Sequence, residues 1–469
     1  MKLLTLLSLA VMMSFAPQQI PNGQPDVAIS ARDRFYTSDQ FSNTVSVIEP
    51  FTNTLLGVIK LGDPTPANLS PLYRGQLLVH GMGFSPDGRT LVVVSIGSNS
   101  VTFIDTATNA VKHTTYVGRS PHEAFFRPDG REVWVSVRGQ DYIAVLDGTS
   151  FKEVGRLAVP NGPGMTIFSP NGKYGYVCSS FSPETVVIDA ETKTIVGRVA
   201  QPSAFCPDIA ATPDGSQVWL TLKDVGKVMA FDARPPFGIL KTIDTGPITN
   251  HVNFARTAAG QFAYVTVGTE NVVKVFRTAD FSPVATVSVG AVPHGVWPSG
   301  DGRRIYVGLE NADAVAAIDT ATNRVVATIP IGQGPQGVAY VPGAVPSGDG
   351  RANLVPLHTV GEKVQLNLNG QGMSQVTLFD QGQVQVLQAV VSGLAPRRSF
   401  VLGLSAKADG SGPVQPLATF VTNPAGSAIV NTIGPLRQIV SSDAGEERRY
   451  LVITGGEGAS ARSPLQVQQ

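Results

Sequence analysis

Residues 121–147, PHEAFFRPDGREVWVSVRGQDYIAVLD, contain the unit from which most of this sequence is built. A first strand, 123–127, leads into a Pro128-Asp129-Gly130 turn, and the runs 132–137 and 142–146 are rich in β-branched and aromatic residues. Asp147 follows, and residues 153–159 give one further run. This composition favours short strands joined by tight turns, so the unit predicts a four-stranded antiparallel sheet.

The unit recurs about every 42 residues. The residue that ends its third strand is found seven times, as Glu49, Asp105, Asp147, Asp189, Asp232, Arg277 and Asp319. The turn returns, in full or in part, at residues 86–88, 170–172, 213–215 and 301–302. A period of this length that consists of strand signals alone predicts a β-propeller. We expect each closing Asp to accept backbone N–H groups two residues further on.

The ends of the repeat region predict how the ring closes. Residues 35–59 supply strands two to four of a blade, and residues 337–341 supply a first strand with no complete blade after it. Together they make a composite blade, which leaves no sheet edge open. We therefore expect an all-β chain with a seven-bladed β-propeller over 30–345, a linker over 346–357, a small β-sandwich-like domain over 358–457 and a mobile tail over 458–469.

Composition limits the location and the partners. Residues 1–16 resemble a secretory signal peptide, and no later segment is apolar for long enough to span a membrane, so we expect an exported, periplasmic or extracellular monomer. Lys+Arg and Asp+Glu number 35 each, which argues against a nucleic-acid partner. No C-x-x-C-H motif for c-type haem occurs. The two cysteines, Cys178 and Cys206, fall near one face of adjacent blades and predict a disulfide, with two buried free thiols as the alternative.

Two rings of side chains are expected at one mouth of the central channel. Four of the six histidines occupy the same repeat position, at the entry to the innermost strand. This first ring consists of His80, His122, Gly164, Pro207, His251, His294 and Gln336. A second ring, at the ends of the second strands, consists of Gln40, Ile96, Arg138, Ser180, Lys223, Gly268 and Glu310.

Three interpretations of these rings stay open. Each His can be a repeat residue that bonds a neighbouring backbone carbonyl. The histidines, His122 and His294 first, can instead bind a metal, although Glu310 is the only carboxylate in either ring. Arg138 and Lys223 can also hold a small anion together with the hub histidines, and Glu310 and Gln336 are further candidate ligand-binding residues on the same face.

The repeat resembles the YVTN family of β-propellers. The namesake strand stands at Tyr264-Val265-Thr266-Val267, with looser forms at residues 176–179 and 306–309, and the Asp-Thr-Ala-Thr-Asn turn stands at 105–109 and 319–323. The resemblance covers about residues 30 to 345. It implies a seven-bladed ring, and the family includes surface and binding proteins. Similar propellers include lactonase-like enzymes and the haem d1 domain of nitrite reductase.

Common enzyme motifs are absent from the sequence, including G-x-S-x-G, H-E-x-x-H and a phosphate-binding Gly loop. We therefore expect an exported binding or scaffold protein whose histidine-bearing face binds a partner protein or a small anionic ligand. The alternatives are a lactonase-like or metal-dependent hydrolase or lyase that acts at the same mouth, and a haem d1-like redox cofactor binder. The sequence requires no cofactor.

Overall fold

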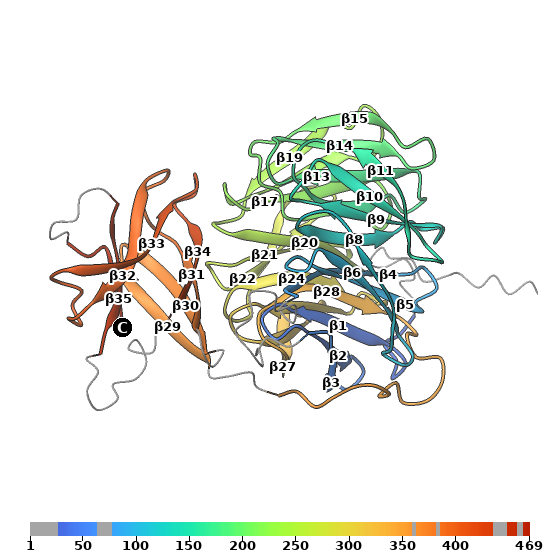
Figure 1. Cartoon of the computed structure of the whole chain (residues 1–469). Coiled ribbons are helices and arrows are strands. Elements are labelled where there is room, and N and C mark those ends of the chain that lie inside the picture. Colours follow the sequence, from blue (N-terminus) through green and yellow to red (C-terminus); the bar gives the residue numbers. More distant parts are fainter. Residues whose placement is uncertain (1–26, 63–76, 359–362, 381–384, 435–447, 457–462) are drawn as a thin grey trace, which may run out of the picture.

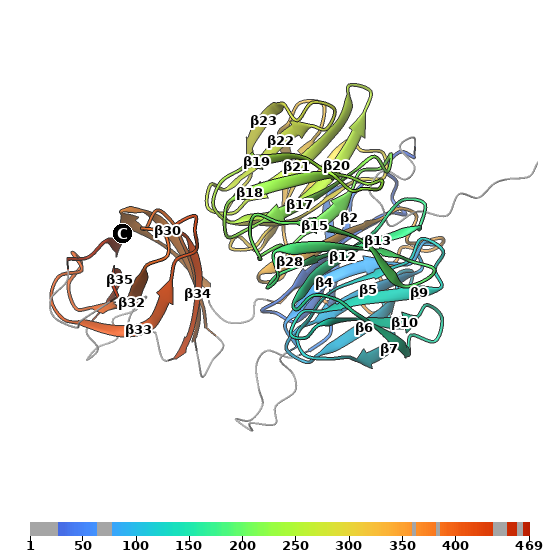
Figure 2. The ribbon, with the colours of Figure 1, turned by 90° about the horizontal axis from the view of Figure 1, so that it is seen from above.

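A computed structural model describes residues 27–62, 77–358, 363–380, 385–434, 448–456 and 463–469. The described residues form 36 strands in eight sheets and no helix, so none of them forms a helix that could cross a membrane (Figures 1 and 2). The predicted signal peptide, 1–16, lies outside these residues. The all-β class is confirmed.

Seven four-stranded antiparallel sheets are arranged as the blades of a propeller. Six of them are continuous in sequence. In chain order their strands are β4 (Val79–Phe84), β5 (Thr90–Ser95), β6 (Ser100–Asp105), β7 (Val111–Tyr116); β8 (Pro121–Phe126), β9 (Glu132–Val137), β10 (Tyr142–Asp147), β11 (Glu153–Ala158); β12 (Pro163–Phe168), β13 (Tyr174–Ser179), β14 (Glu184–Asp189), β15 (Thr194–Ala200); β16 (Ile209–Ala211), β17 (Gln217–Leu222), β18 (Lys227–Asp232), β19 (Ile239–Asp244); β20 (Thr249–Thr257), β21 (Gly260–Val267), β22 (Val272–Arg277), β23 (Pro283–Ser288); β24 (Pro293–Pro298), β25 (Arg304–Leu309), β26 (Ala314–Asp319) and β27 (Arg324–Pro330).

The seventh blade joins the two ends of the repeat region, as predicted. Its strand order is β28-β1-β2-β3, so the C-terminal strand β28 (Pro335–Val341) is innermost. The N-terminal strands β1 (Arg34–Asp39), β2 (Thr44–Glu49) and β3 (Thr54–Lys60) complete it. The antiparallel pairing of Phe35 with Tyr340 closes the ring by backbone hydrogen bonds.

The turn residues have the geometry that their types predict. Gly130 has a φ of 73°, a left-handed conformation that costs glycine little. Asp147 Oδ1 accepts the backbone N–H groups of Thr149 at 3.2 Å and Ser150 at 2.7 Å, and Asp189 repeats this pattern in the next blade. The expected structural role of the closing Asp is confirmed.

Aromatic side chains fill the spaces between the blades. Trp134, Trp219, Tyr176 and Tyr264 are fully buried. The tyrosines keep a hydrogen-bond partner, because Tyr176 Oη donates to the carbonyl of Ala233 at 3.1 Å, in the next blade. Cys178 and Cys206 form a disulfide, with Cα atoms 5.9 Å apart, that joins two adjacent blades; this prediction is confirmed.

The C-terminal region is one eight-stranded sheet with its own apolar core. We expected a small sandwich, but the sheet curls until its edge strands, β33 and β34, contact each other, so it resembles a nearly closed barrel. The order along the sheet is β33-β32-β35-β36-β29-β30-β31-β34. The strands are β29 (Lys363–Gly370), β30 (Gly372–Asp380), β31 (Gln385–Val391), β32 (Ser399–Ser405), β33 (Val414–Val421), β34 (Ala428–Gly434), β35 (Tyr450–Gly455) and β36 (Gln466–Gln468).

Two expectations outside the strands need correction. The predicted linker, 346–357, packs on the propeller: Asn109 Nδ2 donates to the carbonyls of Gly350 and Ala352, and Val355 pairs with Val58 (Figure 1). The predicted mobile tail, 458–469, contains β36, which fills the gap between β29 and β35. The buried side chain of Gln466 donates to two backbone carbonyls there, which fixes the strand in the sheet.

The barrel-like domain lies beside the propeller (Figure 1) and contacts the face on which the first strands begin. The contacts combine an ion pair, hydrogen bonds, a ring pair and an apolar cluster. They are Lys363 with Asp313, Gln375 with Asn271, Ala425 with Asp224, Phe379 with Phe41, and Val390 and Ile429 with Ile248 and Val292. Among the described residues these contacts reach the composite blade and the blades of β16–β19, β20–β23 and β24–β27.

Candidate functional site

The four histidines of the first ring converge, as their repeat position predicts. They lie near the start of β4, β8, β20 and β24 and are all buried. The ring centroids of His80 and His122 are 4.3 Å apart, those of His251 and His294 are 4.6 Å apart, and those of His80 and His294 are 6.2 Å apart. They form a continuous group at the hub.

Two of these histidines bond the neighbouring blade. Nδ1 of His122 lies 2.7 Å from the carbonyl of Gly164, and Nδ1 of His294 lies 3.2 Å from the carbonyl of Gln336. A carbonyl accepts only, so each Nδ1 carries the proton and each Nε2 keeps its lone pair. The imidazoles of His122 and His294 therefore link neighbouring blades, and Nε2 of each remains available.

Two buried carboxyl groups stand beside the histidines, and sequence reasoning missed both. Glu123 Oε1 lies 3.9 Å from Nδ1 of His80, and Asp208 Oδ1 lies 3.5 Å from Nδ1 of His251. Each acid follows a first-ring position directly, as His122-Glu123 and Pro207-Asp208. That adjacency was the signal available, but we took Glu310 as the only carboxylate near the histidines.

The two acids replace backbone pairing that the first strands lose. The register of β4 with β5 shifts between Val79 and Met82, and that of β20 with β21 shifts between Thr249 and Val252. Glu123 Oε2 accepts the N–H of Met82 at 3.1 Å, and Asp208 Oδ2 accepts the N–H of Val252 at 2.7 Å. Each carboxyl therefore joins its own blade to an adjacent one.

Burial keeps most of the hub uncharged. It lowers the pKa of His80 and of His251 to about 3, and it also holds the pKa of His122 and His294 well below the usual range. Nearby Arg138 lowers the pKa of His80 and His122 further. Burial raises the pKa of Asp208 to about 7 and that of Glu123 well above its usual value. The histidines are therefore neutral at pH 7, and burial disfavours the charged form of Glu123.

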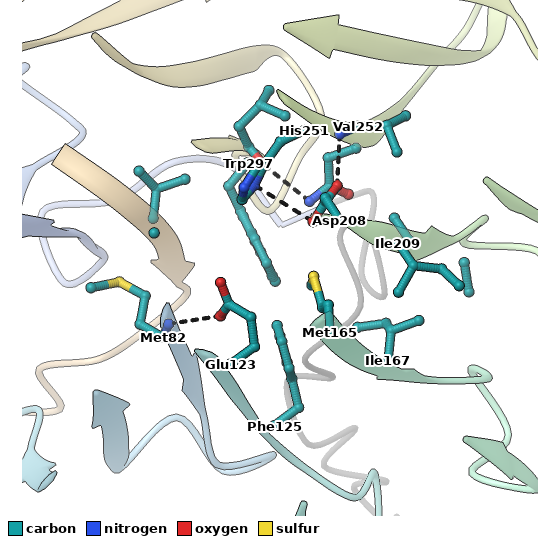
Figure 3. Close-up of a pocket in the computed structure, with 16 residues that line it drawn as sticks. Met82, Glu123, Phe125, Met165, Ile167, Asp208, Ile209, His251, Val252 and Trp297 are labelled. Atoms are coloured by element: carbon teal, nitrogen blue, oxygen red, sulfur yellow. Dashed lines mark hydrogen bonds and ion pairs between the residues drawn. The ribbon is translucent and has the colours of Figure 1, made fainter. Parts of the chain in front are cut away.

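A narrow cavity lies in the channel next to the hub (Figure 3). Its walls are mainly apolar, from Met82, Phe125, Met165 and Trp297 among others. Glu123, Asp208 and His251 also line it. The titratable groups of the hub therefore border an enclosed space of low polarity, where electrostatic interactions are strong.

Two cations of the second ring lie at the same mouth. Arg138 follows β9 and Lys223 follows β17. The guanidinium of Arg138 lies over the ring of Phe205, 5.1 Å from its centroid, and Lys223 is buried. Burial lowers the pKa of Arg138 to about 10 and that of Lys223 to about 8, so both are charged at pH 7.

Glu310 and Gln336 connect the mouth to the barrel-like domain. Burial raises the pKa of Glu310, and the charge of Lys223 opposes that shift. Hydrogen bonds of the Glu310 carboxyl with the side chains of Gln336 and of Gln388 in β31 oppose it as well. The ion pair of Lys363 with Asp313, 2.6 Å, lies on the same blade. Glu310 thus serves the domain contact, and it forms no ion pair with a hub histidine among the described residues.

No family model and no curated protein sequence matches this chain. Among solved structures, hydrazine synthase from Kuenenia stuttgartiensis is 18% identical over 68% of this chain and 99% of that chain, with a TM-score of 0.53. A protein of unknown function from Desulfotomaculum acetoxidans is 13% identical over 66% of this chain and 98% of that chain, with a TM-score of 0.55. Dihydro-heme d1 dehydrogenase NirN overlaps less closely, at 12% identity over 88% of this chain and 78% of that chain, with a TM-score of 0.48. These likenesses concern the fold: the chain is a seven-bladed β-propeller protein with a C-terminal barrel-like domain.

Proposed function

We propose that this protein is an exported binding protein that holds a small anionic ligand at the channel mouth, between the propeller and the barrel-like domain. The observation that carries the proposal is the pair Arg138 and Lys223. Among the described residues, neither cation has a carboxylate within 4 Å, the distance of an ion pair. Glu310 attracts the charge of Lys223 from beyond that distance, whereas no carboxylate of the described residues acts on the half-buried Arg138. A charge held away from water without a full partner is costly, and a carboxylate or phosphate ligand offsets that cost.

Neutral polar groups around the cations support the same ligand class. Ser180 Oγ and His251 Nε2 are buried and have no hydrogen-bond partner among the described residues. Ser180 occupies the second-ring position between Arg138 and Lys223. A hydroxyl and an imidazole can donate to ligand oxygens, so an anion between the two cations would satisfy groups that are otherwise unpaired.

The position of the barrel-like domain supports access from one side. Arg138 is partly exposed and belongs to the blade of β8–β11, which makes none of the domain contacts given above among the described residues. Phe181, 55% exposed, lies 5.8 Å from the same guanidinium. We expect an anion to enter past Arg138 and to end near Lys223, attracted by both charges. The disulfide supports an oxidising, exported location.

The test is to titrate the full chain with phosphate, sulfate and succinate. Binding is measured by calorimetry and by the shift in thermal unfolding. We expect at least one of these probes to bind and the Lys223→Met and Arg138→Met variants to bind it at least tenfold more weakly. Arg119→Met is the matched control, because Arg119 is an exposed cation on the neighbouring loop, where it donates to the carbonyl of Gly139. Binding that all three variants weaken equally, or no binding of any probe, would overturn the proposal.

A second candidate is a hydrolase or lyase that acts at the same mouth. It requires a histidine with a carboxyl group that orients it, and His251 with Asp208 provides that pair at 3.5 Å. The low pKa of His251 makes its imidazole a weak base at pH 7, so we rank this candidate second. Turnover of a lactone or ester panel that His251→Gln abolishes would favour it, whereas turnover unchanged in that variant would exclude His251 as the base.

A further inference from the structure

We infer that His80, His122 and Glu123 form a binding site for a divalent transition-metal ion at the channel hub. This site goes beyond the proposed anion site, although the two share the mouth. One ligand atom from each of the three residues can be chosen so that all three atoms lie within 4.8 Å of one another. A zinc ion with bonds of about 2.0–2.1 Å holds tetrahedral ligands roughly 3.4 Å apart, so side-chain shifts of about 1 Å would close the site.

His122 has the orientation that a metal-binding histidine needs. Its Nδ1–H donates to the carbonyl of Gly164, which fixes the ring and leaves Nε2 as the free lone pair. Metal-binding histidines characteristically donate their other N–H to a carbonyl or carboxylate in this way. The Nδ1 contact also links two blades, so the metal site requires only Nε2 of His122 in addition.

His80 supplies a buried nitrogen that is only weakly bonded. The residue is 7% exposed, and its Nδ1 has no hydrogen bond of ordinary geometry among the described residues, although the carbonyl of His122 acts on it as an acceptor. The nearest carboxyl oxygen, Glu123 Oε1, is 3.9 Å away, which is too far for a hydrogen bond and close enough for both atoms to reach a common ion. A metal between them would satisfy both groups.

Gly81 leaves space for Glu123. A Cβ atom at Gly81 would lie 2.3 Å from Glu123 Oε2 and 2.1 Å from the carbonyl of His122. Any other residue at position 81 would therefore displace the carboxyl or the strand that carries it. The close approach of β4 and β8 holds Glu123 against His80 and His122.

The local charge determines when the metal binds. Arg138 and Lys223 repel a cation at the hub, since both act electrostatically on His80. Ionised Glu123 offsets part of this repulsion, and an anion between the two cations would offset more. Metal and anion are therefore expected to bind with positive coupling. Two imidazoles and one carboxylate suit Zn²⁺, Co²⁺ or Cu²⁺ and leave a coordination position for water or for the anion.

The test uses the full chain without a histidine tag and Co²⁺ as the probe, observed by visible absorption and equilibrium dialysis. We expect one equivalent of Co²⁺ with the absorption of a four- or five-coordinate site. Glu123→Gln and His122→Ala should weaken binding at least tenfold. His113→Ala and His358→Ala remove the two histidines outside the hub and should bind as the wild type does.

Each outcome decides the inference. No stoichiometric Co²⁺ in the wild type would overturn it, and so would unchanged binding in Glu123→Gln, a variant that can still accept the N–H of Met82 and whose fold is checked by near-UV circular dichroism. Lys223→Met separates this inference from the proposed function. That variant should lose the anion and keep or strengthen Co²⁺ binding in anion-free buffer, so either site can fail alone.

Discussion

The carboxyl groups of the outer turns and those of the hub differ in charge state although both accept backbone N–H groups. At the outer turns, hydrogen bonds from Ser150 lower the pKa of Asp147, which remains ionised and is half-exposed. At the hub, burial outweighs the hydrogen bond from Val252 and raises the pKa of Asp208 to about 7. The comparison teaches that a hydrogen bond from a backbone N–H keeps a carboxyl group ionised only where water also reaches the group.

The largest expected effect breaks the hub directly. Gly81→Ala places a methyl group 2.1 Å from the carbonyl of His122, so we expect a loss of about 3 kcal/mol or more in the free energy of unfolding. Gly155→Ala, on the exposed strand β11, meets nothing within 4 Å and should be neutral or slightly stabilising. Urea unfolding of both variants measures the difference, and similar stabilities would show that the hub is not closely packed.

The second effect concerns pH. The pKa of Asp208 in the folded state, about 7, lies above its ordinary value of 3.8. Its stabilising contribution is therefore complete below about pH 3.8 and is lost as the pH rises through about 7. The free energy of unfolding of Asp208→Asn, measured relative to that of the wild type, should therefore rise by about 2 kcal/mol from pH 5 to pH 8.

The hub histidines change stability with pH in the opposite direction. Their pKa values are lowered in the folded protein, so acidification destabilises the fold by favouring the charged form. Comparison of the variant with the wild type at each pH cancels their contribution. Unfolding at pH 5, 6.5 and 8 provides the measurement. A stability difference that does not change with pH would mean that Asp208 is ionised throughout.

The third effect concerns the anion site. Burial lowers the pKa of Lys223 to about 8, so its charge is lost above that pH. We expect anion affinity to fall up to about tenfold per pH unit between pH 8 and pH 10. Lys223→Arg should bind with little change over the same range. Calorimetry at several pH values compares the two proteins, and parallel curves would assign the pH dependence to another group.

The smallest effect belongs to the outer turns. Asp147→Ala removes the hydrogen bonds from the backbone N–H groups of Thr149 and Ser150, but these exposed N–H groups can donate to water instead. We expect a loss below about 1 kcal/mol that disappears at low pH, since a lowered pKa stabilises the fold only above the unfolded value. Urea unfolding at pH 7 and pH 3 checks this. A loss as large as that of Gly81→Ala would erase the contrast between the two regions.

The sequence predicted the parts of the molecule that repeat. The closing Asp residues, the turn glycines and the composite blade follow from local turn chemistry and strand patterns, and the convergence of His80, His122, His251 and His294 follows from their shared register. Glu123 and Asp208 escaped prediction because they do not repeat: each compensates for an irregular pairing in another blade. The contact of Gln388 with Glu310 likewise depends on how two domains pack, which no local pattern encodes.

The most direct test of the binding site is native mass spectrometry of the untagged protein purified from the exported fraction of its own cells. We predict that the wild type and Arg119→Met retain a small anionic molecule, which an Arg138→Met/Lys223→Met double variant has lost. A wild type that has the bare mass of its chain, or a double variant that retains the same molecule, would contradict the account.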